Sequence, residues 1–111
     1  MLPKKELEEL AASIRSTPEY TEVIKLRKKI FGIPQLGNLL QIFEREHTRI
    51  LSLGTSEEQM DTQLKKLYSD NKSFLENQHI KEYVTATQKY QEMISGSMRY
   101  LNQMLDIKHG R

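Results

Sequence analysis

The sequence contains no cysteine and no long run of apolar residues. Without cysteine, this subunit can form no disulfide, no thiolate zinc site and no cysteine-held iron–sulfur cluster, and it offers no cysteine nucleophile. No stretch approaches the roughly 20 apolar residues of a transmembrane helix. The first ten residues also lack the unbroken apolar segment of a secretory signal. We therefore expect a cytoplasmic protein.

Signals for β-strands and for catalysis are missing as well. There is no alternating run of β-branched residues and no Asn-Gly or Asp-Gly hairpin turn. There is also no Gly-rich phosphate loop, Gly-x-Ser-x-Gly elbow or His-Glu-x-x-His pattern. These absences favour an all-α protein that is not an enzyme, and we expect no catalytic residue, no bound metal and no cofactor.

Size and composition indicate a small helical protein with a modest core. A chain of 111 residues fits a single domain, here residues 1–111, and 37% of the residues are apolar while 29% are charged. Small domains bury a smaller share of their surface than large ones do, so oligomerisation is an easy way to cover the remainder. The net charge of +2 is too small to indicate nucleic-acid binding.

Capping and breaking residues divide the chain into about five helices. Thr17 and Pro18 suit the N-cap and first position of a second helix, and Gly32-Ile33-Pro34 interrupts the chain after it. Gly54 can end the third helix, Thr55 and Glu58 have the spacing of a capping box, and Asn77 can cap the last helix. We expect an antiparallel hairpin or bundle of the third, fourth and fifth helices, with the first two packed across it.

The longest predicted helix covers residues 77–107, roughly 40 Å at 1.5 Å per residue. Its apolar stripe carries Thr87 and Gln91 in two middle positions and is otherwise formed by Ile80, Tyr83, Val84, Ile94, Met98, Leu101 and Leu105. A helix of this length needs neighbours, and we expect self-association. The predicted oligomer or partner interface comprises Tyr83, Tyr90, Ile94, Gly96, Met98 and Leu101.

Gly96 lies inside this predicted helix, between two serines. Glycine in a helix costs about 1 kcal/mol relative to alanine. Close approach of another helix, for example from a second subunit, would explain it. A tolerated flaw or a kink is the alternative.

Two Glu-x-x-His pairs, Glu44 with His47 and Glu76 with His79, support a different hypothesis. In di-iron bundles such pairs meet at one metal centre together with two further glutamates. The further glutamates are not evident here, and Glu76 and His79 straddle the expected break at Asn77. A metal-binding helical bundle is therefore an alternative to the interaction module.

A basic cluster of Lys25, Arg27, Lys28 and Lys29 forms a possible polyanion patch. Such a cluster could bind RNA in a salt-dependent manner, so a direct RNA-binding module is a further alternative. The cluster lacks aromatic residues that would stack on bases. Upstream glutamates could instead pair with these side chains on a solvated helix face.

The order of these features resembles the YlbF/YmcA family of small helical regulators found in Firmicutes. In that family a Thr/Ser-Pro/Glu-Glu-Tyr segment starts a helix, a proline marks a later break, and the last helix opens with Asn/Pro-x-Ile/Val-x-x-Tyr. The resemblance covers residues 14–105. The matching positions are Thr17, Pro18, Glu19 and Tyr20, then Pro34, and then Asn77, Ile80 and Tyr83.

The resemblance implies a non-enzymatic adaptor that regulates competence, sporulation or biofilm formation. It implies homo- or hetero-oligomers, family paralogues and a YaaT-like protein as partners, and an influence on ribonuclease Y and messenger-RNA processing. Some family members hold iron–sulfur clusters through cysteine. This chain has no cysteine, so we do not expect a cluster.

Overall fold

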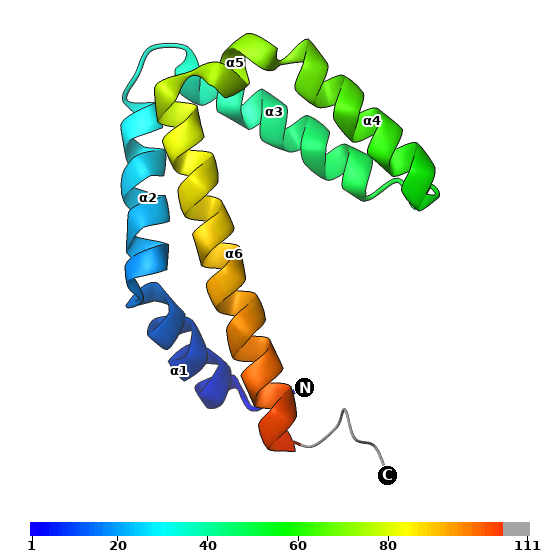
Figure 1. Ribbon diagram of the computed structural model, residues 1–111. Coiled ribbons are helices and arrows are strands. Elements are labelled where there is room, and N and C mark those ends of the chain that lie inside the picture. Colours follow the sequence, from blue (N-terminus) through cyan, green and yellow to red (C-terminus); the bar gives the residue numbers. More distant parts are fainter. Residues whose placement is uncertain (106–111) are drawn as a thin grey trace. The chain divides into compact units, whose positions relative to one another are not determined.

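The computed structural model describes residues 1–105, which form six helices and no strand (Figure 1). The helices are α1 (Lys4–Arg15), α2 (Pro18–Phe31), α3 (Leu36–Leu51), α4 (Glu57–Asp70), α5 (Lys72–Glu76) and α6 (Gln78–Leu105). The all-α class and the long C-terminal helix are therefore confirmed. The final two residues of the predicted stretch 77–107 lie outside the described residues.

Two helix starts follow the capping residues predicted from the sequence. The amide of Tyr20 donates to the Thr17 hydroxyl oxygen at 3.2 Å, so Thr17 caps α2 and Pro18 occupies its first position. The amide of His79 donates to Asn77 Oδ1 at 2.9 Å, which caps α6. Each cap satisfies a backbone donor that the first turn of a helix leaves unpaired.

Two local predictions were wrong. The cap of α4 is Ser56, whose hydroxyl accepts from the Gln59 amide at 3.2 Å, and the Thr55 hydroxyl is buried without a partner among the described residues. The fourth predicted helix also breaks at Asn71, whose side chain donates to the Leu67 carbonyl at 2.8 Å. This side-chain bond competes with regular helix geometry, and it creates the additional short helix α5.

The chain divides into two compact units. The hairpin unit comprises residues 27–82: the end of α2, then α3, α4 and α5, and the beginning of α6. The terminal unit comprises α1, the first part of α2 up to Leu26, and α6 from Tyr83 onward. The single domain expected for residues 1–111 stays a prediction.

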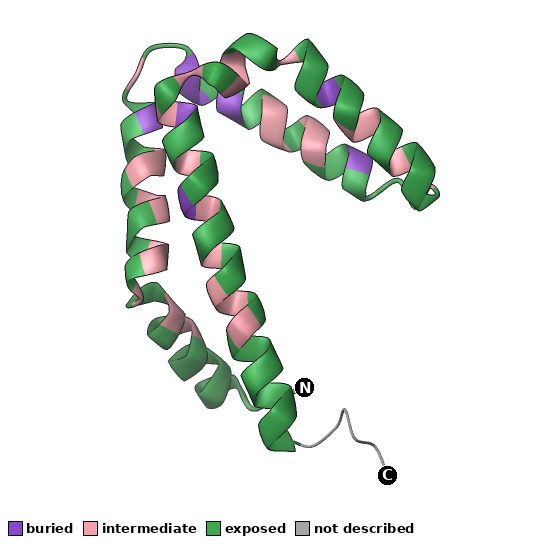
Figure 2. Cartoon of the chain, viewed as in Figure 1, coloured by how far each residue is buried: buried purple, intermediate pink, exposed green. Residues whose placement is uncertain are grey.

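The hairpin unit contains nearly all of the buried apolar side chains. In it α3 and α4 form an antiparallel pair (Figure 1), and Ile50 and Leu67 are buried on these two helices. The remaining buried side chains come from the end of α2, the beginning of α3 and the beginning of α6: Ile30, Leu36, Leu40 and Ile80. Figure 2 shows buried positions gathered where these three segments meet. Ile30 and Ile80 are almost fully enclosed, so the core of this unit lies around the α2–α3 turn.

A close contact at Gly37 shapes this turn. Gln35 adopts a left-handed conformation with φ 68°, which directs the chain into α3. A Cβ placed on Gly37 would lie 2.6 Å from a ring carbon of Phe31 and 3.1 Å from the Phe31 Cα. Only glycine leaves room for Phe31 here, because the backbone of Phe31 cannot move aside as a flexible side chain could.

The terminal unit, by contrast, has almost no enclosed core. Among its described residues only Ala86 is buried, as the single purple band of Figure 2 on that part of α6 indicates. Tyr20 of α2 and Tyr90 of α6 pack against each other, with ring centroids 6.0 Å apart and planes tilted by 56°. Such an aromatic pair holds the two helices together without enclosing either one.

We predict that Gly37→Ala destabilises the protein by about 1–3 kcal/mol, the usual cost of overpacking a core. Denaturant unfolding followed by far-UV circular dichroism measures the change. Gly32→Ala is the matched control, because a Cβ there meets nothing closer than the Lys29 carbonyl oxygen at 3.4 Å. Equal stability of the two variants would contradict the tight contact between Gly37 and Phe31.

Candidate interaction surfaces

Most of the large apolar side chains that the terminal unit exposes lie on α6. Its exposed side chains include Val84 at 39%, Met98 at 51%, Leu101 at 39% and Leu105 at 57% of their full accessible area. Tyr100 and Met104 are exposed even further. Monomeric proteins rarely expose large apolar patches to water, so these side chains make α6 a candidate interaction surface.

The structure separates the six predicted interface residues into groups. Tyr83, Tyr90 and Ile94 are half-buried within the chain, and Tyr90 already packs against Tyr20. Met98 and Leu101 are exposed. At 3.6 residues per turn these five share one side of α6, and Gly96 lies roughly 150° around the helix from their centre. One straight partner helix therefore cannot cover all six.

Gly96 causes no break, since α6 continues through it. A Cβ placed there would meet only the end of the Arg99 side chain, at 3.7 Å. No helix in the described part of the chain approaches Gly96 closely enough to require glycine. The close approach inferred from the sequence would have to come from another molecule.

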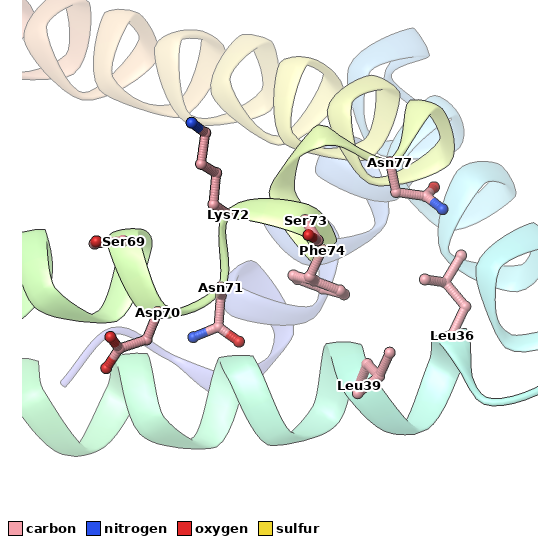
Figure 3. Close-up of a pocket in the computed structure, with 9 residues that line it drawn as sticks. All are labelled: Leu36, Leu39, Ser69, Asp70, Asn71, Lys72, Ser73, Phe74 and Asn77. Carbon is pink, nitrogen blue, oxygen red and sulfur yellow. The ribbon is translucent and has the colours of Figure 1, made fainter.

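A groove runs beside the junction of α4 and α5, in the hairpin unit (Figure 3). It has a volume of about 550 Å³. Leu36 and Leu39 of α3 and the ring of Phe74 of α5 form its apolar part, and Lys72 points away from them. Leu39 is 48% exposed, so this groove offers apolar contact area to another molecule.

A second groove of about 450 Å³ continues along α3 and α4 and shares Asp70 and Asn71 with the first. Ile42 lines it and is exposed. Ion pairs form its rim: Arg49 Nε donates to Glu46 Oε1 at 2.9 Å, and Lys66 Nζ donates to Asp70 Oδ2 at 2.8 Å. The hydrogen bond from Arg49 lowers the pKa of Glu46, and the hydrogen bond to Asp70 raises the pKa of Lys66, so the rim keeps both signs of charge.

The residues of the metal hypothesis do not assemble into a metal site. Glu44 accepts both guanidinium hydrogen bonds of Arg27, His47 stacks on Phe43, and Glu76 is exposed. His79 Nδ1 is buried and has no hydrogen-bond partner within residues 1–105. Across residues 1–105, no group of three His, Asp or Glu side chains is arranged to hold an ion.

His47 instead belongs to a cluster of rings between α3, α4 and α5. Phe43 stacks on His47 and on Tyr68 with centroids 6.1 and 6.2 Å apart, and it packs against Phe74 at 5.5 Å. The Tyr68 hydroxyl lies 3.4 Å from His47 Nε2. Aromatic packing of this kind fixes the hairpin, so His47 has a structural role here.

The basic cluster divides into two parts. Arg27 forms a bidentate ion pair with Glu44 of α3, with N–O distances of 2.7 and 3.1 Å, and its guanidinium lies 4.9 Å from the Phe31 ring centre. Lys25, Lys28 and Lys29 are exposed, and within residues 1–105 none of them forms an ion pair. Of the four cluster residues, these three lysines are the ones without an ion pair within residues 1–105, and RNA binding stays a prediction.

Sequence reasoning missed the Arg27–Glu44 pair and both grooves. Arg27 stands among lysines, and 17 positions separate it from its partner, so no local spacing marks the pair. The grooves depend on the break at Asn71, which the apolar pattern does not reveal. Within residues 1–105, no helix has the length and apolar character needed to span a bilayer.

One known family matches residues 4–106 of the chain, and its description is control of competence regulator ComK, YlbF/YmcA. No curated protein and no solved structure matches the chain significantly. The match extends beyond the 14–105 segment on which the resemblance in the sequence was based.

We predict that Gly96→Ala raises the free energy of unfolding by up to about 1 kcal/mol, because alanine favours helix and the added methyl group has room. Chemical denaturation measures this change, and light scattering gives the particle mass. Lower stability or a smaller particle would contradict this, and would identify Gly96 as a contact with another molecule.

Proposed function

Because the chain belongs to the YlbF/YmcA family, described as controlling the competence regulator ComK, we propose that it is a non-enzymatic regulatory adaptor. The family expected from the sequence is thus the family found. The adaptor acts in the cytoplasm and assembles with copies of itself or with family paralogues. It presents its surface to RNA-processing and cell-fate machinery.

The observation that carries this proposal is the contrast between the two units. The terminal unit buries only Ala86 among its described residues, whereas the hairpin unit buries six apolar side chains: Ile30, Leu36, Leu40, Ile50, Leu67 and Ile80. Fully burying a Leu- or Met-sized side chain contributes about 1.5–3 kcal/mol. Met98 and Leu105, each about half exposed, therefore each have roughly 1 kcal/mol to gain from a partner.

Five of the expected residues form the proposed interface: Tyr83, Tyr90, Ile94, Met98 and Leu101. Met98 and Leu101 offer the most new contact area, while the other three are half-covered already. Gly96 lies on the other side of α6 and takes part only if a second neighbour approaches there.

The finer parts of the proposal come from the resemblance to the family. They name paralogues and a YaaT-like protein as partners, an influence on ribonuclease Y, and roles in sporulation and biofilm formation in addition to competence. Two surfaces are available for more than one partner. The exposed face of α6 can serve assembly, while the grooves along α3, α4 and α5 lie in the other unit.

We predict that Met98→Glu weakens assembly at least tenfold, because association would bury an unpaired carboxylate. Light scattering on a sizing column should then give the mass of one chain, 13.1 kDa, with the far-UV helical signal retained. Gln103→Glu is the matched control, because it adds the same charge to the opposite face of α6. In cells, Met98→Glu should lower transformation frequency while the control does not.

Mixing experiments identify the partner. The protein is run alone, and then with each YlbF/YmcA paralogue and the YaaT-like protein of the same genome. A mixed complex of defined mass that Met98→Glu abolishes supports the adaptor. A single chain that joins none of these proteins contradicts it.

A further inference from the structure

The exposed face of α6 has the spacing of a coiled-coil seam. Val84, Gln91, Met98 and Leu105 recur at intervals of seven residues. Three residues after each of the first three lie Thr87, Ile94 and Leu101. Alternating steps of three and four over three heptads are the pattern by which one α-helix packs along another.

The seam has two rows: the first is Val84, Gln91, Met98 and Leu105, and the second is Thr87, Ile94 and Leu101. The structure leaves the first row open. Val84, Met98 and Leu105 are 39%, 51% and 57% exposed, and Gln91 is exposed beside them. In the second row Thr87 and Ile94 are half-buried at the edge where α6 faces the rest of the terminal unit, and Leu101 is 39% exposed. The contact between Tyr20 and Tyr90 lies to one side, so a further helix can reach the seam.

The positions flanking the seam allow a second copy of the same helix to pack there. Charged residues at these positions normally select the partner of a coiled coil and repel like charges. From residue 83 to residue 104 the flanking side chains carry no charge: Tyr83, Gln88, Tyr90, Ser95, Ser97, Asn102 and Met104. The charges in this part of α6 lie at outer positions, for example Lys89 and Arg99. Two identical helices can therefore meet along this seam without repulsion between charges.

Gln91 restricts how two copies can pair. Its side chain has no hydrogen-bond partner within residues 1–105, and an amide buried in an apolar seam is costly unless it is bonded. In a parallel pair in register, Gln91 faces Gln91 of the other copy, and the two amides can bond. In the antiparallel register with full overlap, Gln91 instead faces Ile94, which offers no bond.

Thr87, the other polar residue of the seam, does not need a hydrogen-bond partner from the second copy. Its hydroxyl already donates to the Tyr83 carbonyl at 2.9 Å. It can face another Thr87 without an unpaired donor, so the choice of register rests on Gln91.

We propose that α6 pairs with α6 of a second copy as a parallel coiled coil in register, and that a hydrogen bond between the two Gln91 side chains fixes that register. This inference rests on the self-association proposed above. It adds the orientation of the helices and the residue that selects the partner. A polar side chain at one inner position is a known means of specifying register at some cost in stability.

Single cysteines test the orientation, and the natural chain has none to interfere. Under oxidation by copper phenanthroline, Leu101→Cys should cross-link with itself, and Gln103→Cys on the outer face should not. When the Val84→Cys and Leu101→Cys proteins are mixed, disulfides between residue 84 of one chain and residue 101 of the other should not exceed the amount that random collision gives. A disulfide joining residues 84 and 101 in place of 101 and 101 would overturn the parallel arrangement, since these residues meet only in the antiparallel register.

Substitution of Gln91 tests its role. Gln91→Leu should lower the dissociation constant of the pair about tenfold or more, because it removes a buried amide from the seam. Analytical ultracentrifugation measures this constant. The variant should also lose the single register, so that residue pairs 101–101 and 84–101 both cross-link. Gln103→Leu, the same change on the outer face, should alter neither. A Gln91→Leu protein that keeps one register and one affinity would overturn the role of Gln91.

The outcomes separate this inference from the proposed function. A wild-type chain that stays at 13.1 kDa alone and with every paralogue contradicts both. A chain that assembles only with a paralogue, or only in the antiparallel register, overturns the inference and leaves the adaptor in place.

Discussion

Amphipathic helices must cover their apolar faces, and the arrangement of this chain follows from where it can do so. Around the α2–α3 turn the chain buries Ile30, Leu36, Leu40 and Ile80. Gly37 allows Phe31 to pack closely against the start of α3 there. The terminal unit has no equivalent. Its helices touch through Tyr20 and Tyr90 but enclose only Ala86 among the described residues. The uncovered length of α6 is therefore the feature that a functional account of this protein must explain.

The sequence predicted what depends on neighbouring residues along the chain. Thr17 and Asn77 cap helices because their side chains reach backbone amides two or three residues ahead, and such spacing is visible without a structure. The prediction failed where two local signals competed, as at Thr55 and Ser56, and where a side chain bonded back into its own helix at Asn71. The bond between Arg27 and Glu44 joins distant segments, so no local pattern indicated that one member of the basic cluster was already engaged.

The exposed face of α6 could be predicted from the sequence only in part, for a related reason. The spacing of apolar residues along α6 identified a helix with too much apolar surface, which the structure supports. The spacing alone could not tell which side the chain covers itself. The structure divides the stripe: Tyr90 and its neighbours face the other helices of the terminal unit, whereas Val84, Met98 and Leu105 remain exposed. The family is described as controlling the competence regulator ComK, and the assembly role of these exposed side chains is the part that we propose.

The central claim is that assembly covers the exposed face of α6, and amide hydrogen exchange at two protein concentrations tests it most directly. Exchange from a helix requires local opening, and a partner that binds only the closed helix slows it. The account predicts slower exchange across residues 84–105 at the higher concentration, with little change in the hairpin unit. Exchange rates in α6 that do not depend on concentration would contradict it.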